Sequence, residues 1–359
     1  MYKSFEIRNF RCFKQLNISK LQRINLIAGL NNSGKTALLE ALVLHIGATN
    51  PALAITVNAF RGITQMKLEP GNIGDFPWRT LFREMDFSSE VTLIGHDTVT
   101  GSRTLHLRIL QNPSEVEENI SPQTFSAGTA NVASSQLPTG ALELEDVRKD
   151  GSRSYRLLVE PSGIRSVPVP PPPPFPGHFL ATRLRLSPEE DATRFSNLAK
   201  IKKQGMVLEA LQLIEPRLRK LEVLVAFGES MIHGDIGFDE LVPLPVMGDG
   251  MVRLASMVLA IAASPQGVVL IDEFENGLHY SVLQKAWAAI AKAARSFDTQ
   301  VFATTHSWEC IVAAHKAFQE RKPYDFALYR LDRRDNEINA VSYDEEALEA
   351  SIQSELEVR

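Results

Sequence analysis

The chain is poor in cysteine, with only Cys12 and Cys310 among its 359 residues. Two cysteines cannot build a disulfide framework, and their separation does not match paired metal ligands. No apolar run approaches the roughly 18 to 20 residues that span a bilayer, and the N-terminal residues lack the apolar core of a secretory signal. We therefore expect a cytoplasmic protein without a membrane-spanning segment.

The chain also lacks an excess of positive charge. It carries 38 basic and 43 acidic residues, for a net charge of -5. Binding to nucleic acid depends on neutralising phosphates with lysine and arginine, so the whole chain has no such electrostatic footprint. The basic cluster Arg217–Lys220 is interpreted as a solvated surface. Binding of DNA by one face of a dimer stays open.

What the sequence does contain is an eight-residue segment, Gly29–Thr36, with the G-x-x-x-x-G-K-[ST] pattern of a phosphate-binding loop. It follows the apolar run Ile24–Ala28, a predicted strand, and opens a predicted buried helix over residues 35–46. Glycines let successive backbone N–H groups turn toward phosphate oxygens, Lys35 supplies a charge for the β and γ phosphates, and Thr36 offers a hydroxyl to Mg²⁺. The residues expected to bind nucleotide here are Asn31, Asn32, Ser33, Gly34, Lys35, Thr36 and Ala37.

Two carboxylates follow a second apolar strand, Gly267–Ile271. In a parallel sheet the carboxyl end of a neighbouring strand faces the bound nucleotide. Asp272 is therefore expected to hold Mg²⁺ together with Thr36, and Glu273 to orient and deprotonate the attacking water. No Asn-Lys-x-Asp motif for guanine is present, which disfavours a GTPase.

Two further motifs complete the predicted site. His306 follows the strand Gln300–Ala303 and can hydrogen-bond a γ-phosphate oxygen. Gly248 and Gly250 open a predicted helix over about residues 250–264, and a glycine-rich turn at a helix N-terminus is a second anion site.

The order of the elements predicts an α/β fold in which helices flank a mostly parallel sheet. We divide it into an N-terminal lobe (1–87), an insertion of antiparallel strands (88–180) and a C-terminal lobe (181–359). Residues 1–30 are expected to form two strands, 111–140 a mobile loop, 188–224 helices, and 331–335 a turn after a last strand. The proline-rich segment Pro168–Pro176 is interpreted as a stiff connector between lobes, with docking to an aromatic groove as the alternative.

Together these motifs resemble ABC-type ATPases of the SMC, RecF and OLD group. Asn9-Phe10-Arg11, the phosphate loop (Walker A), the glycine turn (signature), the carboxylate strand (Walker B) and the switch histidine occur in the order of that group. The motif sequences are most similar to those of OLD-like ATPases, because Ile-Asp-Glu-x-Glu-Asn-Gly-Leu-His and Thr-Thr-His-Ser both occur.

The resemblance implies a head-to-head dimer that binds ATP and Mg²⁺. Gly248 and Gly250 of one subunit would close on the γ-phosphate held by Lys35 of the other, and Arg11 would lie near the nucleotide. Gln65 is compared with the Q-loop residue of the group but is interpreted as a surface residue. The chain departs from the pattern because Asp249 separates the two glycines, and because only about 50 residues follow His306, too few for a Toprim nuclease domain.

The leading hypothesis is an ATPase subunit whose ATP-driven dimerisation gates a separate effector, such as a Toprim-type nuclease, in defence against phage. The first alternative is a RecF-like DNA-repair ATPase, which the acidic composition disfavours. The second is a non-catalytic scaffold that binds nucleotide, which the presence of Glu273 disfavours.

Overall fold

The structure, a computed structural model, describes residues 1–63, 77–110, 140–160, 163–182, 187–226, 228–320 and 323–354, together with 356 and 358. Gln65 and nearly all of the predicted 111–140 loop lie outside these residues. The chain divides into two compact units: unit 1 is Met1–Ser4, Asn17–Leu39 and Phe175–Arg359, and unit 2 is Phe5–Leu16 and Glu40–Pro174. Within the described ranges, no helix is long and apolar enough to cross a membrane.

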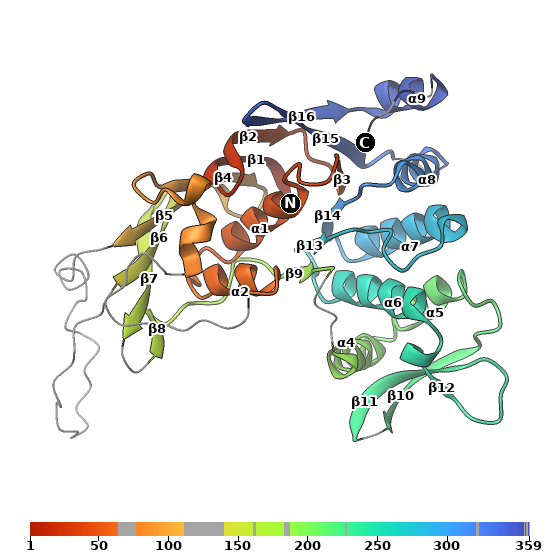
Figure 1. Cartoon of the computed structure of the whole chain (residues 1–359). Helices are drawn as coiled ribbons and strands as arrows, with labels where there is room; N and C mark the ends of the chain where they lie inside the picture. The colour runs from red at the N-terminus through yellow and green to blue at the C-terminus, as the bar shows by residue number, and fades with distance from the viewer. Residues whose placement is uncertain are drawn as a thin grey trace, which may run out of the picture. The chain divides into compact units, whose positions relative to one another are not determined.

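Unit 1 is built on a six-stranded sheet in the order β16-β15-β3-β14-β13-β9 (Figure 1). Its strands are β3 (Ile24–Ala28), β9 (Gly177–Leu180), β13 (Val268–Ile271), β14 (Gln300–Thr304), β15 (Phe326–Arg334) and β16 (Glu337–Tyr343). All neighbours pair in parallel except β16, which pairs antiparallel at the edge. The predicted α/β fold with a mostly parallel sheet is confirmed.

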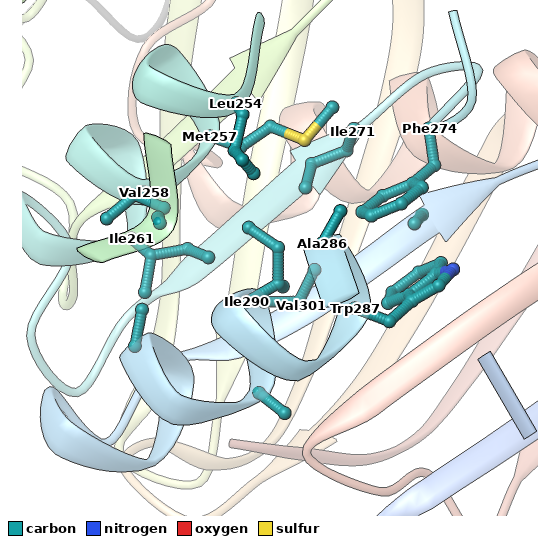
Figure 2. Packing of buried hydrophobic residues seen from close by; sticks show 14 of the residues in the cluster. Leu254, Met257, Val258, Ile261, Ile271, Phe274, Ala286, Trp287, Ile290 and Val301 are labelled. Atoms are coloured by element: carbon teal, nitrogen blue, oxygen red, sulfur yellow. The ribbon is translucent and has the colours of Figure 1, made fainter. Parts of the chain in front are cut away.

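Helices cover this sheet, as its continuously apolar strands require. The helices that lie wholly within this unit are α4 (Pro188–Lys200), α5 (Gly205–Leu211), α6 (Asp249–Ala262), α7 (Leu283–Ser296), α8 (Trp308–Gln319) and α9 (Glu345–Gln353). Figure 1 shows α6, α7 and α8 side by side along the sheet. Figure 2 shows how their apolar side chains, such as Ile261 of α6 and Ile290 of α7, pack with Val301 of β14. This core fixes the strand ends from which the site residues project.

The prediction of helices over 188–224 is wrong at its C-terminal end. After α5 the chain forms a small sheet of β10 (Lys220–Ala226), β11 (Glu229–Asp235) and β12 (Val242–Pro243). The leucines up to Leu211 recur at helical spacing, whereas the apolar residues from Leu221 onward also fit the alternation of a strand. Pro216 separates these two stretches, and pairing with β11 makes the second one a strand.

The predicted turn over 331–335 is also wrong. β15 continues to Arg334, and Asp332 and Arg333 pair with Asn339 and Ile338 of β16. The turn is confined to the two residues between the strands, where Asp335 has φ 53°. The outer end of this hairpin is exposed, so it lacks the apolar alternation that would have marked a strand.

Unit 2 contains most of a seven-stranded sheet in the order β2-β1-β4-β5-β6-β7-β8. Its strands are β1 (Tyr2–Phe10), β2 (Phe13–Ser19), β4 (Val91–Asp97), β5 (Gly101–Leu110), β6 (Gly140–Arg148), β7 (Gly151–Glu160) and β8 (Gly163–Val167). Strands β4 to β8 pair antiparallel, which confirms the predicted antiparallel insertion. β2 was not predicted, so residues 1–30 hold three strands rather than two. The unit also holds a short helix, α2 (Leu53–Ala59).

The proline-rich segment connects β8 to β9 without hydrogen-bonded secondary structure of its own. The division between the units falls within it, between Pro174 and Phe175. Its interpretation as a stiff connector stays a prediction.

Candidate active site

The predicted phosphate loop joins β3 to α1 (Lys35–Ile46), and both elements have the predicted bounds. Asn32 and Gly34 adopt positive φ angles of 64° and 96°, so the loop curls before the helix begins. The Leu38 N–H donates to the Gly34 carbonyl at 2.9 Å and opens the helix. The chain thus forms the strand, tight loop and helix N-terminus that bind phosphate in this motif.

Gly29 is required by the packing of the loop. Its φ is +147°, and a Cβ there would stand 2.6 Å from the Ser33 hydroxyl and 2.8 Å from the Leu331 carbonyl. Ser33 and Ala37 are buried, whereas Asn31 and Asn32 are exposed. The loop is therefore packed on its inner side and open on the side that carries the two asparagines.

Lys35 folds back over this loop. Its Nζ donates hydrogen bonds to the carbonyls of Gly29 and Leu30, both at 2.8 Å. Burial lowers the pKa of the Lys35 ammonium, and nearby carboxylates oppose that shift. Those carboxylates belong to Asp272, Glu273 and Glu275.

The structure brings Thr36 and Asp272 together, and their shared role in holding Mg²⁺ stays a prediction. The Thr36 hydroxyl lies 3.1 and 3.2 Å from the two carboxylate oxygens of Asp272. Thr304, at the end of β14, donates its hydroxyl to the same carboxylate at 2.7 Å and accepts the backbone N–H of Glu273 at 2.8 Å. Sequence reasoning missed Thr304, although it noted the polar end of this strand.

Glu273 lies on the loop that follows β13, with a positive φ of 50° and a half-buried side chain. The next residue, Phe274, is fully buried. Figure 2 shows its ring against that of Trp287. The ring centroids lie 3.7 Å apart and the interplanar angle is 8°. This buried aromatic pair anchors the loop that carries the carboxylates.

His306 is half exposed, with 51% of its side chain accessible. Its ring Nδ1 lies 3.2 Å from Glu275 Oε1, and its backbone N–H donates to the same oxygen at 3.0 Å. Glu275 was not singled out from the sequence, although it stands inside the quoted carboxylate motif.

The glycine turn stands at the N-terminus of α6, with Gly248 as the exposed N-cap at φ 119°. Gly250 touches the loop after the carboxylates, since a Cβ there would stand 2.8 Å from the Gly277 carbonyl. No described side chain lies within 4 Å of a Cβ placed on Gly248. The turn is thus packed at Gly250 and open at Gly248.

Arg253, one turn into α6, ties this helix to the carboxylate loop. Its guanidinium donates to the backbone carbonyl of Asp272 at 2.6 Å and lies 3.4 Å from that of Glu273. Burial lowers the pKa of this guanidinium, against the attraction of three carboxylates. The sequence offered no signal for this residue beyond its place after the glycine turn.

Arg11 belongs to unit 2 and is held there by other side chains. Its guanidinium pairs with Glu40 at 2.9 Å and donates to Asn58 at 2.9 Å and to the Thr80 carbonyl at 3.3 Å. Burial lowers its pKa, and Glu40 opposes the shift. The expectation that Arg11 lies near the nucleotide stays a prediction.

The chemistry of the site suits Mg²⁺. No group of three or more His, Cys, Asp and Glu side chains that could cage a metal occurs in the described part of the chain. Mg²⁺ does not need such a cage, because it keeps several waters and takes one or two protein oxygens plus phosphates. The adjacent oxygens of Thr36 and Asp272 fit that donor set.

Comparisons with known proteins relate the chain to a family and to a known fold. The sequence model of the family described as "AAA domain, putative AbiEii toxin, Type IV TA system" matches residues 24–311. A protein of Helicobacter pylori named ATP/GTP phosphatase is 27% identical over 387 aligned residues, covering 99% of each chain. A shorter match, 44% identical over 48 residues, relates 13% of this chain to 22% of an uncharacterized protein of Methanocaldococcus jannaschii.

Among solved structures, an SMC head bound to the C-terminal winged-helix domain of ScpA is similar, with a TM-score of 0.51 at 13% identity. The similarity covers 98% of this chain and 99% of that one, and it shows a shared fold. The chain belongs to the AAA-domain family whose model matches it, and it has the fold of an SMC head.

Proposed function

We propose that this chain hydrolyses ATP with Mg²⁺ at a site that a second copy of the chain completes, and that this assembly controls a separate effector protein. The observation that carries the catalytic part is the Thr304 hydroxyl, which joins the Asp272 carboxylate to the Glu273 backbone. The same carboxylate meets Thr36 of the phosphate loop. The residues suited to metal binding and to base catalysis are therefore linked by hydrogen bonds.

Each residue has a distinct role in this proposal. Lys35 has three N–H donors, of which two bond loop carbonyls and the third is directed to a phosphate oxygen. Glu273 takes a proton from the attacking water as that water bonds to the γ-phosphorus and ADP leaves. His306 hydrogen-bonds the γ-phosphate. Bound Mg²⁺, held by Thr36 and Asp272, would neutralise charge on the β and γ phosphates.

The composite site is supported by the glycine turn. Gly248 is exposed at the N-terminus of a 14-residue helix, where backbone N–H groups and the helix dipole favour an anion. Asp249 follows it in the first turn and offers a carboxylate instead of a hydroxyl. Backbone N–H groups, rather than a side-chain hydroxyl, would therefore contact the γ-phosphate of the other copy.

The biological role rests on the OLD-like motifs, and we propose control of an effector such as a Toprim-type nuclease in anti-phage defence, in the cytoplasm. The name of the Helicobacter pylori relative, ATP/GTP phosphatase, supports nucleoside triphosphate hydrolysis. A RecF-like role on DNA is the second candidate, and steep salt dependence of DNA-stimulated turnover would distinguish it.

The test of the catalytic proposal compares two variants. Glu273→Gln should bind ATP but lose about 10²- to 10⁴-fold in turnover, the usual loss on removing a positioned base. Lys35→Ala should lose binding of the triphosphate, measured by equilibrium binding of a labelled non-hydrolysable ATP analogue. Turnover of Glu273→Gln at the wild-type rate would show that Glu273 is not the base.

A further inference from the structure

We infer that Glu275 is a positioning residue that holds His306 in the orientation needed to meet the γ-phosphate. The inference rests on the proposed function, because it gives His306 that task. The observation behind it is that one carboxylate oxygen, Glu275 Oε1, accepts the His306 backbone N–H at 3.0 Å and lies 3.2 Å from its ring Nδ1. Two contacts to one oxygen fix both the backbone and the ring.

The two side chains differ in how much solvent they meet. Glu275 is largely buried, with 13% of its side chain exposed, whereas His306 is 51% exposed. A half-exposed imidazole on a loop has several rotamers available to it. The contact with the largely buried Glu275 carboxylate reduces the number of rotamers open to His306.

The loop that carries Glu275 is held rigidly. The Phe274 ring is buried against Trp287, and the Phe274 N–H donates to the Thr304 carbonyl at 2.9 Å. The Leu278 N–H donates to the Glu275 carbonyl at 2.9 Å and closes a turn. Glu275 therefore contacts His306 from a fixed position on the loop after β13, beside the end of β14.

Two cations from other elements interact with the Glu275 carboxylate. They are Lys35 of α1 and Arg253 of α6. From α8, burial and then the Glu275 charge raise the pKa of the Cys310 thiol to about 12, so this neighbour stays neutral. The second oxygen, Oε2, is buried and has no hydrogen-bond partner in the described residues. A buried carboxylate with an unpaired oxygen is costly for folding, so it calls for a functional explanation.

The contact has a chemical consequence for the imidazole. A carboxylate beside Nδ1 favours a proton on that nitrogen and leaves Nε2 as the atom that faces the substrate. Glu275 thereby sets which ring nitrogen His306 presents to the γ-phosphate.

The experiment measures kcat and the KM for ATP for the full chain and four variants: Glu275→Gln, Glu275→Asp, His306→Ala and the double variant Glu275→Gln/His306→Ala. We expect Glu275→Gln to lower kcat about tenfold while the KM for ATP stays as in wild type. Glu275→Asp keeps the carboxylate and should lose less kcat. The double variant should be no slower than His306→Ala alone. ATP binding should be unchanged throughout.

Glu309→Gln is the matched control, because Glu309 follows His306 by three residues and accepts a hydrogen bond from the Ser307 hydroxyl instead. It should leave kcat as in wild type. A loss of kcat in Glu275→Gln that multiplies with the loss in His306→Ala in the double variant would overturn the inference while leaving the proposed ATP hydrolysis intact. Wild-type turnover in Glu273→Gln would instead overturn the proposed function itself.

Discussion

At the residue scale, one hydroxyl connects the two carboxylate residues of the site. Thr304 donates to Asp272 at 2.7 Å and accepts from the Glu273 backbone at 2.8 Å. Hydrogen bonds to charged groups contribute about 1.5–3 kcal/mol to stability. Thr304 therefore sets where Asp272 points and where the Glu273 backbone lies.

Replacing Thr304 by valine tests this role. Thr304→Val keeps the shape but removes the hydroxyl, so we expect kcat to fall at least about tenfold, a loss of about 1.4 kcal/mol in transition-state stabilisation. Thr299→Val is the matched control. Thr299 precedes the same strand and is also fully buried, but its hydroxyl donates to the carbonyls of Ile261 and Ser264.

Steady-state ATP turnover and thermal unfolding should be measured for both threonine variants. Both are expected to lose stability, because each leaves buried polar groups unpaired. Equal kcat in the two variants would show that Thr304 has only a structural role.

Some site residues could be predicted from the sequence and others could not, for a physical reason. Lys35, Thr36 and the pair Asp272 and Glu273 occur in contiguous motifs, where the chemistry needs fixed residue types at fixed spacing. Thr304 and Arg253 act through contacts between elements distant in sequence. Such contacts depend on the tertiary fold, so no local pattern reports them.

At the element scale, the glycine turn and the carboxylate loop are in direct contact. A Cβ on Gly250 would stand 2.8 Å from the Gly277 backbone carbonyl, which is closer than real Cβ atoms approach. A backbone carbonyl cannot move away as readily as the end of a flexible side chain. A side chain at position 250 must therefore displace the start of α6 or the loop after β13.

We expect Gly250→Ala to lower turnover about tenfold or more through this displacement, a loss of roughly 1.4 kcal/mol, while ATP binding at the phosphate loop is retained. Gly205→Ala is the matched control, because Gly205 begins a helix and a Cβ there meets nothing within 4 Å. ATP affinity and kcat should be measured for both. Full activity in Gly250→Ala would show that the packing of these two loops does not matter for hydrolysis.

Elements with one dominant periodicity could be predicted from the sequence, and ambiguous ones could not. β3 and α1 have their predicted bounds because a short apolar strand and a long apolar helix flank a known loop. β10 was taken for helix because its leucines continue a helical spacing. β16 was missed because its exposed hairpin carries little apolar alternation.

At the scale of the whole molecule, the parallel sheet of unit 1 joins segments that are distant in the chain. β3 lies between β14 and β15, and β13 lies between β14 and β9. The α/β class followed from alternating strands and helices, but the strand order depends on long-range pairing that no window of sequence contains. It is this order that brings the ends of β3, β13 and β14 to one edge.

At this scale we propose that two copies of the chain share each ATP site. The most direct test is steady-state ATP turnover per subunit against protein concentration, with the oligomeric mass followed by light scattering and Glu273→Gln as the blank. We predict that specific activity rises with concentration as dimers form, because Gly248 of one copy then reaches the nucleotide held by Lys35 of the other. Full specific activity in samples that light scattering shows to be monomeric would contradict the account.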